Sequence, residues 1–207
     1  CEIQKILEKE ADKLRPEFER LKERIQKQFG QHYDETSWKV AKGTQGNFGW
    51  IMTGTETPEA VFLLGKSRGK GNIEKLNSKT EIGITDDYPA YKNQFKYHQL
   101  CWAHPNQKLR DLKDSDMLNE KQKEICLKNY QDFSVLYEKL RETLKIDFEY
   151  EKTYKYFFRK LTEISKPNPL NFKKLKTIKE TLSKNKEKYL TCLRFPGLIP
   201  PDNNKAE

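Results

Sequence analysis

The order in which β-rich and helical segments alternate constrains this chain more than any other feature. Three short segments rich in β-branched and aromatic residues, separated by turns that contain Gly or Pro, predict a three-stranded meander at residues 32–41, 47–55 and 59–66. A turn and a short helix are predicted at 67–77. They are followed by a strand at 81–86, a short helix at 89–93, a strand at 95–101 and a helix from Ala103 to about Leu112.

Helical periodicity dominates both sides of this region. In residues 1–29 an apolar residue recurs every three or four positions, which predicts one helical face made of Leu14, Phe18, Leu21, Ile25 and Phe29. Pro16 fits the first turn of that helix and Gly30 fits its C-terminal cap, so residues 2–14 are expected to form a separate short helix. The same periodicity predicts three later helices, at 126–144, 149–164 and 169–193.

Three strands, a helix, a strand, a helix, a strand and a helix is the order of an RNase H-like α/β fold, a five-stranded mixed sheet flanked by helices. In that fold the first and fourth strands are neighbours at the centre of the sheet. The predicted division is an N-terminal helical segment (1–30), an RNase H-like core (31–115), a basic helical insertion (116–194) and the start of a core helix (195–207).

Positive charge is concentrated in the later helices. Residues 152–194 hold 13 Lys or Arg against 3 Glu, and the whole chain has a net charge of +9. This asymmetry favours a polyanionic partner, most simply nucleic acid; a solvated lysine-rich helix surface is the alternative. Only 35% of the residues are hydrophobic, which predicts a thin core.

Cysteine usage and hydropathy bear on the cellular context. Four widely spaced cysteines without a CxxC pair or a secretory segment favour reduced thiols inside a cell. No apolar run approaches the ~20 residues of a membrane span. The chain starts without Met and stops abruptly after NNKAE, so we interpret it as an internal fragment.

Three acidic residues carry the functional hypothesis: Asp34 in HYDETSWKV, Asp86 in GITDDYPAY and Glu207 in PPDNNKAE. Acids in a first strand, at the end of a later strand and on a late helix are the arrangement of a two-metal phosphoryl-transfer site. Two Mg²⁺ ions roughly 4 Å apart need clustered carboxylates. Taken alone, Asp34 reads as a surface strand residue and Asp86 as a helix N-cap.

Six blocks of sequence occur in a fixed order: HYDETSWKV, NFGWIMTGT, SRGKG, TDDYPAY, HQLCWAHPNQKLRDL and FPGLIPPDNNKAE. Together they resemble the catalytic domain of bacterial and archaeal insertion-sequence transposases, and more narrowly the insertion sequence sixty-six family. The resemblance covers about residues 14–115 and 194–207 and matches the helical segment between them in character only.

The resemblance implies a DDE transposase in which Asp34, Asp86 and Glu207 hold two Mg²⁺ or Mn²⁺ ions. The reaction is cleavage of DNA strands followed by strand transfer. Asp87 stands where the family usually has Gly, so Asp87 is an alternate to Asp86, and Glu35 is an alternate to Asp34. The chain also ends before the Arg that normally follows the final Glu.

Basic and imidazole side chains are predicted to contact DNA: Arg68, His104, Lys108, Arg110, Lys173 and Lys174. Arg68 lies in a Gly-rich turn without P-loop spacing. The resemblance places His104 near the active site, and His32 shares a strand face with Asp34. Zinc is disfavoured because Cys101 and His104 lack a second pair of ligands, so a buried Cys101 and a packing role for Trp102 are favoured.

The predicted partner is double-stranded DNA, both transposon ends and target. A homo-oligomer on DNA and accessory proteins of the same element are further predicted partners, and no membrane is involved. The predicted location is the prokaryotic cytoplasm, with association to the nucleoid during activity. Three alternatives stay open: an RNase H-like nuclease without strand transfer, a catalytically dead DNA-binding remnant of a transposase, and a helical protein-interaction module, which the charge of residues 152–194 disfavours.

Overall fold

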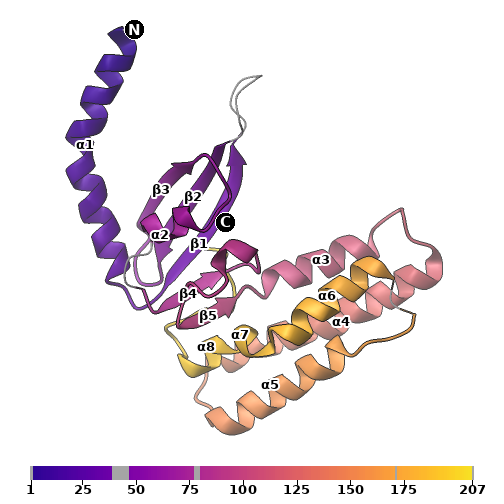
Figure 1. Cartoon of the computed structure of the whole chain (residues 1–207). Coiled ribbons are helices and arrows are strands. Elements are labelled where there is room, and N and C mark those ends of the chain that lie inside the picture. The colour runs from indigo at the N-terminus through magenta and orange to yellow at the C-terminus, as the bar shows by residue number, and fades with distance from the viewer. Residues whose placement is uncertain (1, 39–46, 77–79, 171, 207) are drawn as a thin grey trace. The chain divides into compact units, whose positions relative to one another are not determined.

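The chain has an α/β fold built on one mixed sheet (Figure 1). The computed structural model describes residues 2–38, 47–76, 80–170 and 172–206. The sheet has the strand order β3-β2-β1-β4-β5, and its strands are β1 Gln31–Trp38, β2 Asn47–Gly54, β3 Ala60–Gly65, β4 Ile82–Thr85 and β5 Tyr97–Leu100. This confirms the predicted fold class, since a five-stranded mixed sheet flanked by helices is consistent with an RNase H-like domain.

Two compact units share the chain. The first holds residues 1–83, 88–96 and 205–207, and the second holds 84–87 and 97–204. The four-part division predicted from the sequence stays a prediction.

The first unit is the meander with its helices. Strands β1, β2 and β3 pair antiparallel, with Asp34 opposite Ile51 and Ile51 opposite Phe62. Its other elements are α1 Glu2–Gln26, α2 Gly71–Leu76 and the 3₁₀ turn η1 Pro89–Tyr91. Their apolar side chains form one core of fully or almost fully buried residues: Ile25, Tyr33, Trp50, Met52, Val61, Ile73, Leu76 and Tyr91. The predicted meander and the short helix after it are confirmed within the described residues, whereas 39–41 of the first predicted strand and residue 77 lie outside them.

Helix α1 differs from the prediction in both its length and its end. It is continuous through Pro16, whereas a separate helix at 2–14 was expected. Proline costs a helix one hydrogen bond and a ring clash, and here residues 2–17 are solvent exposed, so water can satisfy the orphaned carbonyl. The helix stops at Gln26, before the expected Gly30 cap. The side-chain amide of Gln31 instead donates to the terminal carbonyls of Ile25 and Gln28, both at 2.9 Å.

The second unit is a set of helices around β5. It contains α3 Ala103–Lys113, α4 Glu120–Thr143, α5 Tyr150–Ser165, α6 Lys173–Lys184, α7 Lys186–Tyr189 and α8 Thr191–Arg194. Trp102, fully buried, stacks on Phe133 and Tyr137 of α4 with ring centroids 5.2 and 5.8 Å apart. Cys101 is buried beside it. The packing roles favoured for both residues are confirmed.

The single helix expected at 169–193 is wrong, because the segment breaks into α6, α7 and α8. The first break follows from Asn185, whose side-chain amide donates to the carbonyl of Thr181 and competes with the helix ladder. At the second break, the backbone N–H of Cys192 donates to the side chain of Gln99 at 2.7 Å. That partner lies far away in sequence, so no local pattern could show it.

Two further properties of the described residues bear on the predicted context. Cys101, Cys126 and Cys192 are free thiols and all three are buried. None of the helices in the described ranges combines the length and apolarity needed to cross a membrane.

Candidate active site

The alternation of β1 separates Asp34 from its neighbours. Tyr33 and Glu35 are buried on the face that carries the core of the first unit, whereas Asp34 is only partly buried. Successive side chains of a strand point to opposite faces, so Asp34 shares its face with His32, which is 1% exposed. The predicted opposition of Asp34 and Glu35 agrees with this pattern of burial.

The carboxylate of Glu35 is buried and is hydrogen bonded by two other side chains. Its side chain has no exposed surface, and its two carboxylate oxygens accept hydrogen bonds from the guanidinium of Arg68 and the hydroxyl of Tyr91. The Arg68 guanidinium also lies 3.9 Å from the ring centre of Tyr88, whose hydroxyl donates to the Arg68 carbonyl. A buried carboxylate needs such partners. These residues, the Glu35 cluster, therefore join β1, the Gly-rich turn and the 88–91 segment.

This geometry bears on two predicted roles. Glu35 already has a cation and a hydroxyl on its carboxylate, and its role as an alternate to Asp34 stays a prediction. Arg68 has its guanidinium on Glu35, but 45% of its side chain is exposed. Contact of Arg68 with a phosphate stays a prediction. Tyr91 had no role predicted from the sequence, although its position five residues after Asp86 in DDYPAY placed it close to the candidate site.

Asp86 and Asp87 follow β4 directly and belong to the second unit. The carboxylate of Asp87 lies 3.6 Å from the ammonium of Lys108 on α3, and both are partly exposed. Burial, and then the charges of Asp87, Cys101 and Asp86, raise the pKa of the Tyr189 phenol. Asp87 thus has a cation beside its carboxylate.

The last residue of β4 connects to β5 through a buried polar pair. The hydroxyl of Thr85 lies 2.8 Å from Nε2 of His98, and the hydroxyl of Thr191 donates to the His98 carbonyl. Burial, and then the charge of Lys188, lowers the pKa of His98 to about 3. His98 is therefore neutral at physiological pH and holds the end of the strand that leads into Asp86.

A second buried network surrounds Gln99, which has no exposed surface. Its amide nitrogen donates to the carbonyls of Tyr189 and Pro201, at 3.2 and 3.4 Å, while its oxygen accepts from Cys192. The indole N–H of Trp102 donates to the same Tyr189 carbonyl at 2.6 Å. Gln99 was not singled out from the sequence; the only signal was a polar residue inside an otherwise buried strand.

The same block holds the segment that leads to the last predicted acid. The backbone N–H of Trp102 donates to the Pro201 carbonyl at 3.0 Å, and the N–H of Asn203 donates to the sulfur of Cys101 at 3.2 Å. Asp202 accepts a hydrogen bond from Tyr137 of α4 at 2.8 Å. Glu207 itself lies outside the described residues. The segment 99–102 therefore holds the backbone at Pro201 and Asn203, shortly before Glu207 in the sequence.

The remaining predicted DNA contacts lie on helices. His104 is in the first turn of α3, partly buried, and Arg110 is an exposed residue of the same helix with Asp111 beside it at 3.8 Å. Lys173 and Lys174 are exposed in the first turn of α6. None of these roles is tested by the geometry, and all stay predictions.

Two of the predicted acids, Asp34 and Asp86, lie within the described residues, and they belong to different units. Asp34 belongs to the first unit and Asp86 to the second. Within the part of the chain that the structure describes, no cluster of three or more His, Cys, Asp or Glu side chains has the spacing to hold a metal ion.

Comparison with known proteins identifies the family. No curated protein and no solved structure matches the chain significantly. The family model described as "Transposase IS66 family" matches residues 2–207. This match extends the resemblance seen in the six blocks through the helical segment between them. The chain therefore belongs to the IS66 family of transposases.

Proposed function

We propose that this chain is a DDE catalytic domain that cleaves DNA strands at transposon ends and transfers them into target DNA. Membership of the IS66 family supports a transposase role and implies a DNA substrate. The observation that carries the finer proposal is the split along β1. Asp34 is partly exposed, whereas the adjacent Glu35 is buried on Arg68 and Tyr91.

In this proposal Asp34, Asp86 and Glu207 hold two Mg²⁺ or Mn²⁺ ions. Carboxylate oxygens are the donors that these hard cations prefer, so the residues fit the ions. Held by these acids, such ions would supply Lewis-acid activation of water or of a DNA 3′ hydroxyl and stabilisation of the leaving oxygen. Asp86 is preferred over Asp87 because Asp87 stands at the position where the family usually has Gly.

The chain's own residues position these acids and the DNA. The Glu35 cluster fixes β1 next to Asp34, and the Gln99 network fixes the segment that precedes Glu207. Lys108, Arg110, Lys173 and Lys174 supply contacts to the phosphate backbone, which position DNA without reading its sequence. The proposal also includes action on the prokaryotic nucleoid, with accessory proteins of the same element.

Strand chemistry on labelled DNA tests the proposal. The chain is incubated with a labelled duplex and a target plasmid in Mn²⁺, beside Asp34→Asn, Asp86→Asn and Asp87→Asn. Cleavage by the parent chain and Asp87→Asn, but not by the other two, is the expected result. Equal cleavage by Asp34→Asn would refute the assignment of Asp34.

Two alternatives differ in the products. A nuclease without strand transfer gives cut duplex but no label joined to the plasmid. A DNA-binding remnant gives salt-dependent binding and no cut product in any variant. For all three functions, log binding constant is expected to fall linearly with log salt concentration. The double variant Lys173→Glu/Lys174→Glu should weaken binding and reduce the magnitude of that slope by about 2, since each lost phosphate contact lowers it by about 1.

A further inference from the structure

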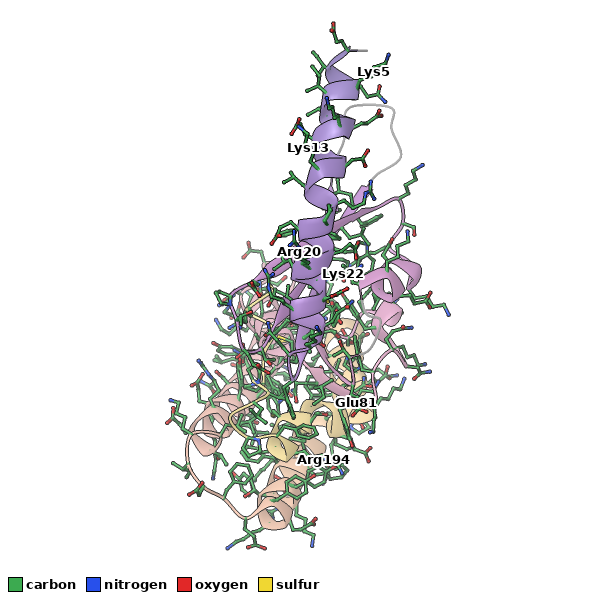
Figure 2. The ribbon with its side chains drawn as sticks, turned by 90° about the vertical axis from the view of Figure 1, so that its left-hand side faces the viewer. Lys5, Lys13, Arg20, Lys22, Glu81 and Arg194 are labelled. Atoms are coloured by element: carbon green, nitrogen blue, oxygen red, sulfur yellow. The ribbon has the colours of Figure 1, made fainter. Side chains whose placement is uncertain are left out.

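Helix α1 has two halves with different surroundings. Phe18, Leu21 and Ile25 pack on the core of the first unit. Residues 2–17 are all exposed, including Leu7 at 65% and Leu14 at 66%. Figure 2 shows side chains projecting from α1 on several sides, Lys5 and Lys13 among them. Most helical stability in proteins comes from packing of an apolar face, and exposed apolar patches mark interaction sites.

The exposed half continues the apolar spacing of the buried half. Apolar side chains are separated by four, three, four, three and four residues, and we call them the α1 seam: Leu7, Ala11, Leu14, Phe18, Leu21 and Ile25. This is the a/d spacing of a coiled coil, with Leu at every d position. Ile3 and Ile6, 68% and 56% exposed, widen the apolar surface on the g side of the seam.

The charges beside the seam match a second copy of the same helix. With Leu7, Leu14 and Leu21 at d, Glu10 and Glu17 occupy g positions, and Arg15 and Lys22 occupy e positions. In a parallel pair each g residue meets the e residue five positions later on the partner. Glu10 then meets Arg15 beside Ala11 and Leu14, in the exposed half of the helix. An antiparallel pair would instead bring Glu10 near Glu17.

A groove beside the α1 seam carries more basic than acidic side chains. It measures about 660 Å³ and is lined from α1 by Ala11, Leu14 and Phe18 and from the rest of its unit by Leu63 and Leu76. Its rim carries Arg15, Lys22 and Lys75 together with Glu19. The groove thus lies on the basic e side, where the acidic g side of a parallel partner would run.

From the seam, its flanking charges and the groove, we infer that α1 is a self-association helix, which binds α1 of a second copy as a parallel coiled coil. Helix pairing buries Leu7 and Leu14 of both chains and exchanges the intrahelical ion pairs of Glu10 and Arg15 for pairs between chains. This inference does not depend on the proposed catalysis.

Sedimentation of the full chain over a concentration series tests the inference without DNA or metal. The parent chain is expected to convert from monomer to dimer as concentration rises. Leu7→Glu removes one buried leucine from each helix of the pair and should raise the dissociation constant about a hundredfold. Lys9→Glu, on the outer face, is the matched control and should leave the constant unchanged.

Charge exchange and crosslinking test the pairing itself. Glu10→Arg and Arg15→Glu should each weaken self-association, and a mixture of the two should associate better than either alone. In a Cys1→Ser background, Leu7→Cys should form a disulfide between copies only if the helices are parallel. A chain that stays monomeric throughout, or a dimer indifferent to Leu7→Glu, would overturn the inference. Helix content from circular dichroism confirms that each variant is folded.

Discussion

Two buried polar groups hold the surroundings of the candidate site, and they do so by different chemistry. Glu35, in the first unit, is a charged group matched by the cation of Arg68 and the hydroxyl of Tyr91. Gln99, in the second unit, is neutral and bonds to backbone groups of three separate segments. A charged anchor depends on its partner side chains, whereas an amide anchor leaves a backbone N–H unpaired when it is lost. The two should therefore respond differently to near-isosteric substitution.

The largest loss of stability is expected for Gln99→Leu. The N–H of Cys192 loses its buried partner, and an unsatisfied buried group costs up to about 3 kcal/mol. The carbonyls of Tyr189 and Pro201, by contrast, keep their bonds from Trp102. The free energy of unfolding should fall by about 3 kcal/mol in urea titration. A loss under about 1 kcal/mol, which a surface substitution also gives, would remove the distinction between the two anchors.

Acid should destabilise the second unit through His98. Its pKa is about 3 when folded and near 6.5 when exposed, so the unfolded chain binds the extra proton first. Stability that is present above about pH 6.5 is then lost progressively as the pH falls toward 3. The free energy of unfolding, measured by urea titration at several pH values, should depend less on pH for His98→Gln than for the parent chain. An equal dependence on pH would contradict the assignment.

A smaller effect is expected for Glu35→Gln. The amide oxygen still accepts one hydrogen bond, and Arg68, being partly exposed, can turn toward water. The expected cost is about 1–2 kcal/mol, in line with the loss of one charge-assisted bond. Arg68→Gln is the matched partner variant, and the double variant should cost less than the sum of the two single changes. Additive losses would show that the two side chains do not act together.

The smallest effect on stability is expected for Asp34→Asn. Its side chain is partly exposed, so the free energy of unfolding should change by about 0.5 kcal/mol or less. Strand cleavage should nevertheless disappear if Asp34 holds a metal ion. Loss of cleavage together with a loss of stability as large as that of Gln99→Leu would instead indicate a structural role for Asp34.

The sequence predicted what depends on local pattern. Alternation and turns located the meander, and spacing located α3, α4 and α5. The sequence-based predictions failed where contacts between residues far apart in the chain determine where a helix ends. Gln31 ends α1 before Gly30, and Gln99 takes the N–H of Cys192 at the break between α7 and α8. The identity of the neighbours of Glu35 could not be predicted either, because Arg68 and Tyr91 reach it only after three separate segments have folded together.

The alternation of β1 also has a consequence for inheritance. Asp34 and Glu35 are adjacent in the gene, yet one faces away from the core and the other is fastened inside it. A single nucleotide change in the Asp34 codon can therefore abolish the proposed catalysis while the protein still folds. Such an inactive protein would keep α1 and would pair with an active one. An insertion sequence that accumulates mutations would then encode inhibitors of its own transposition.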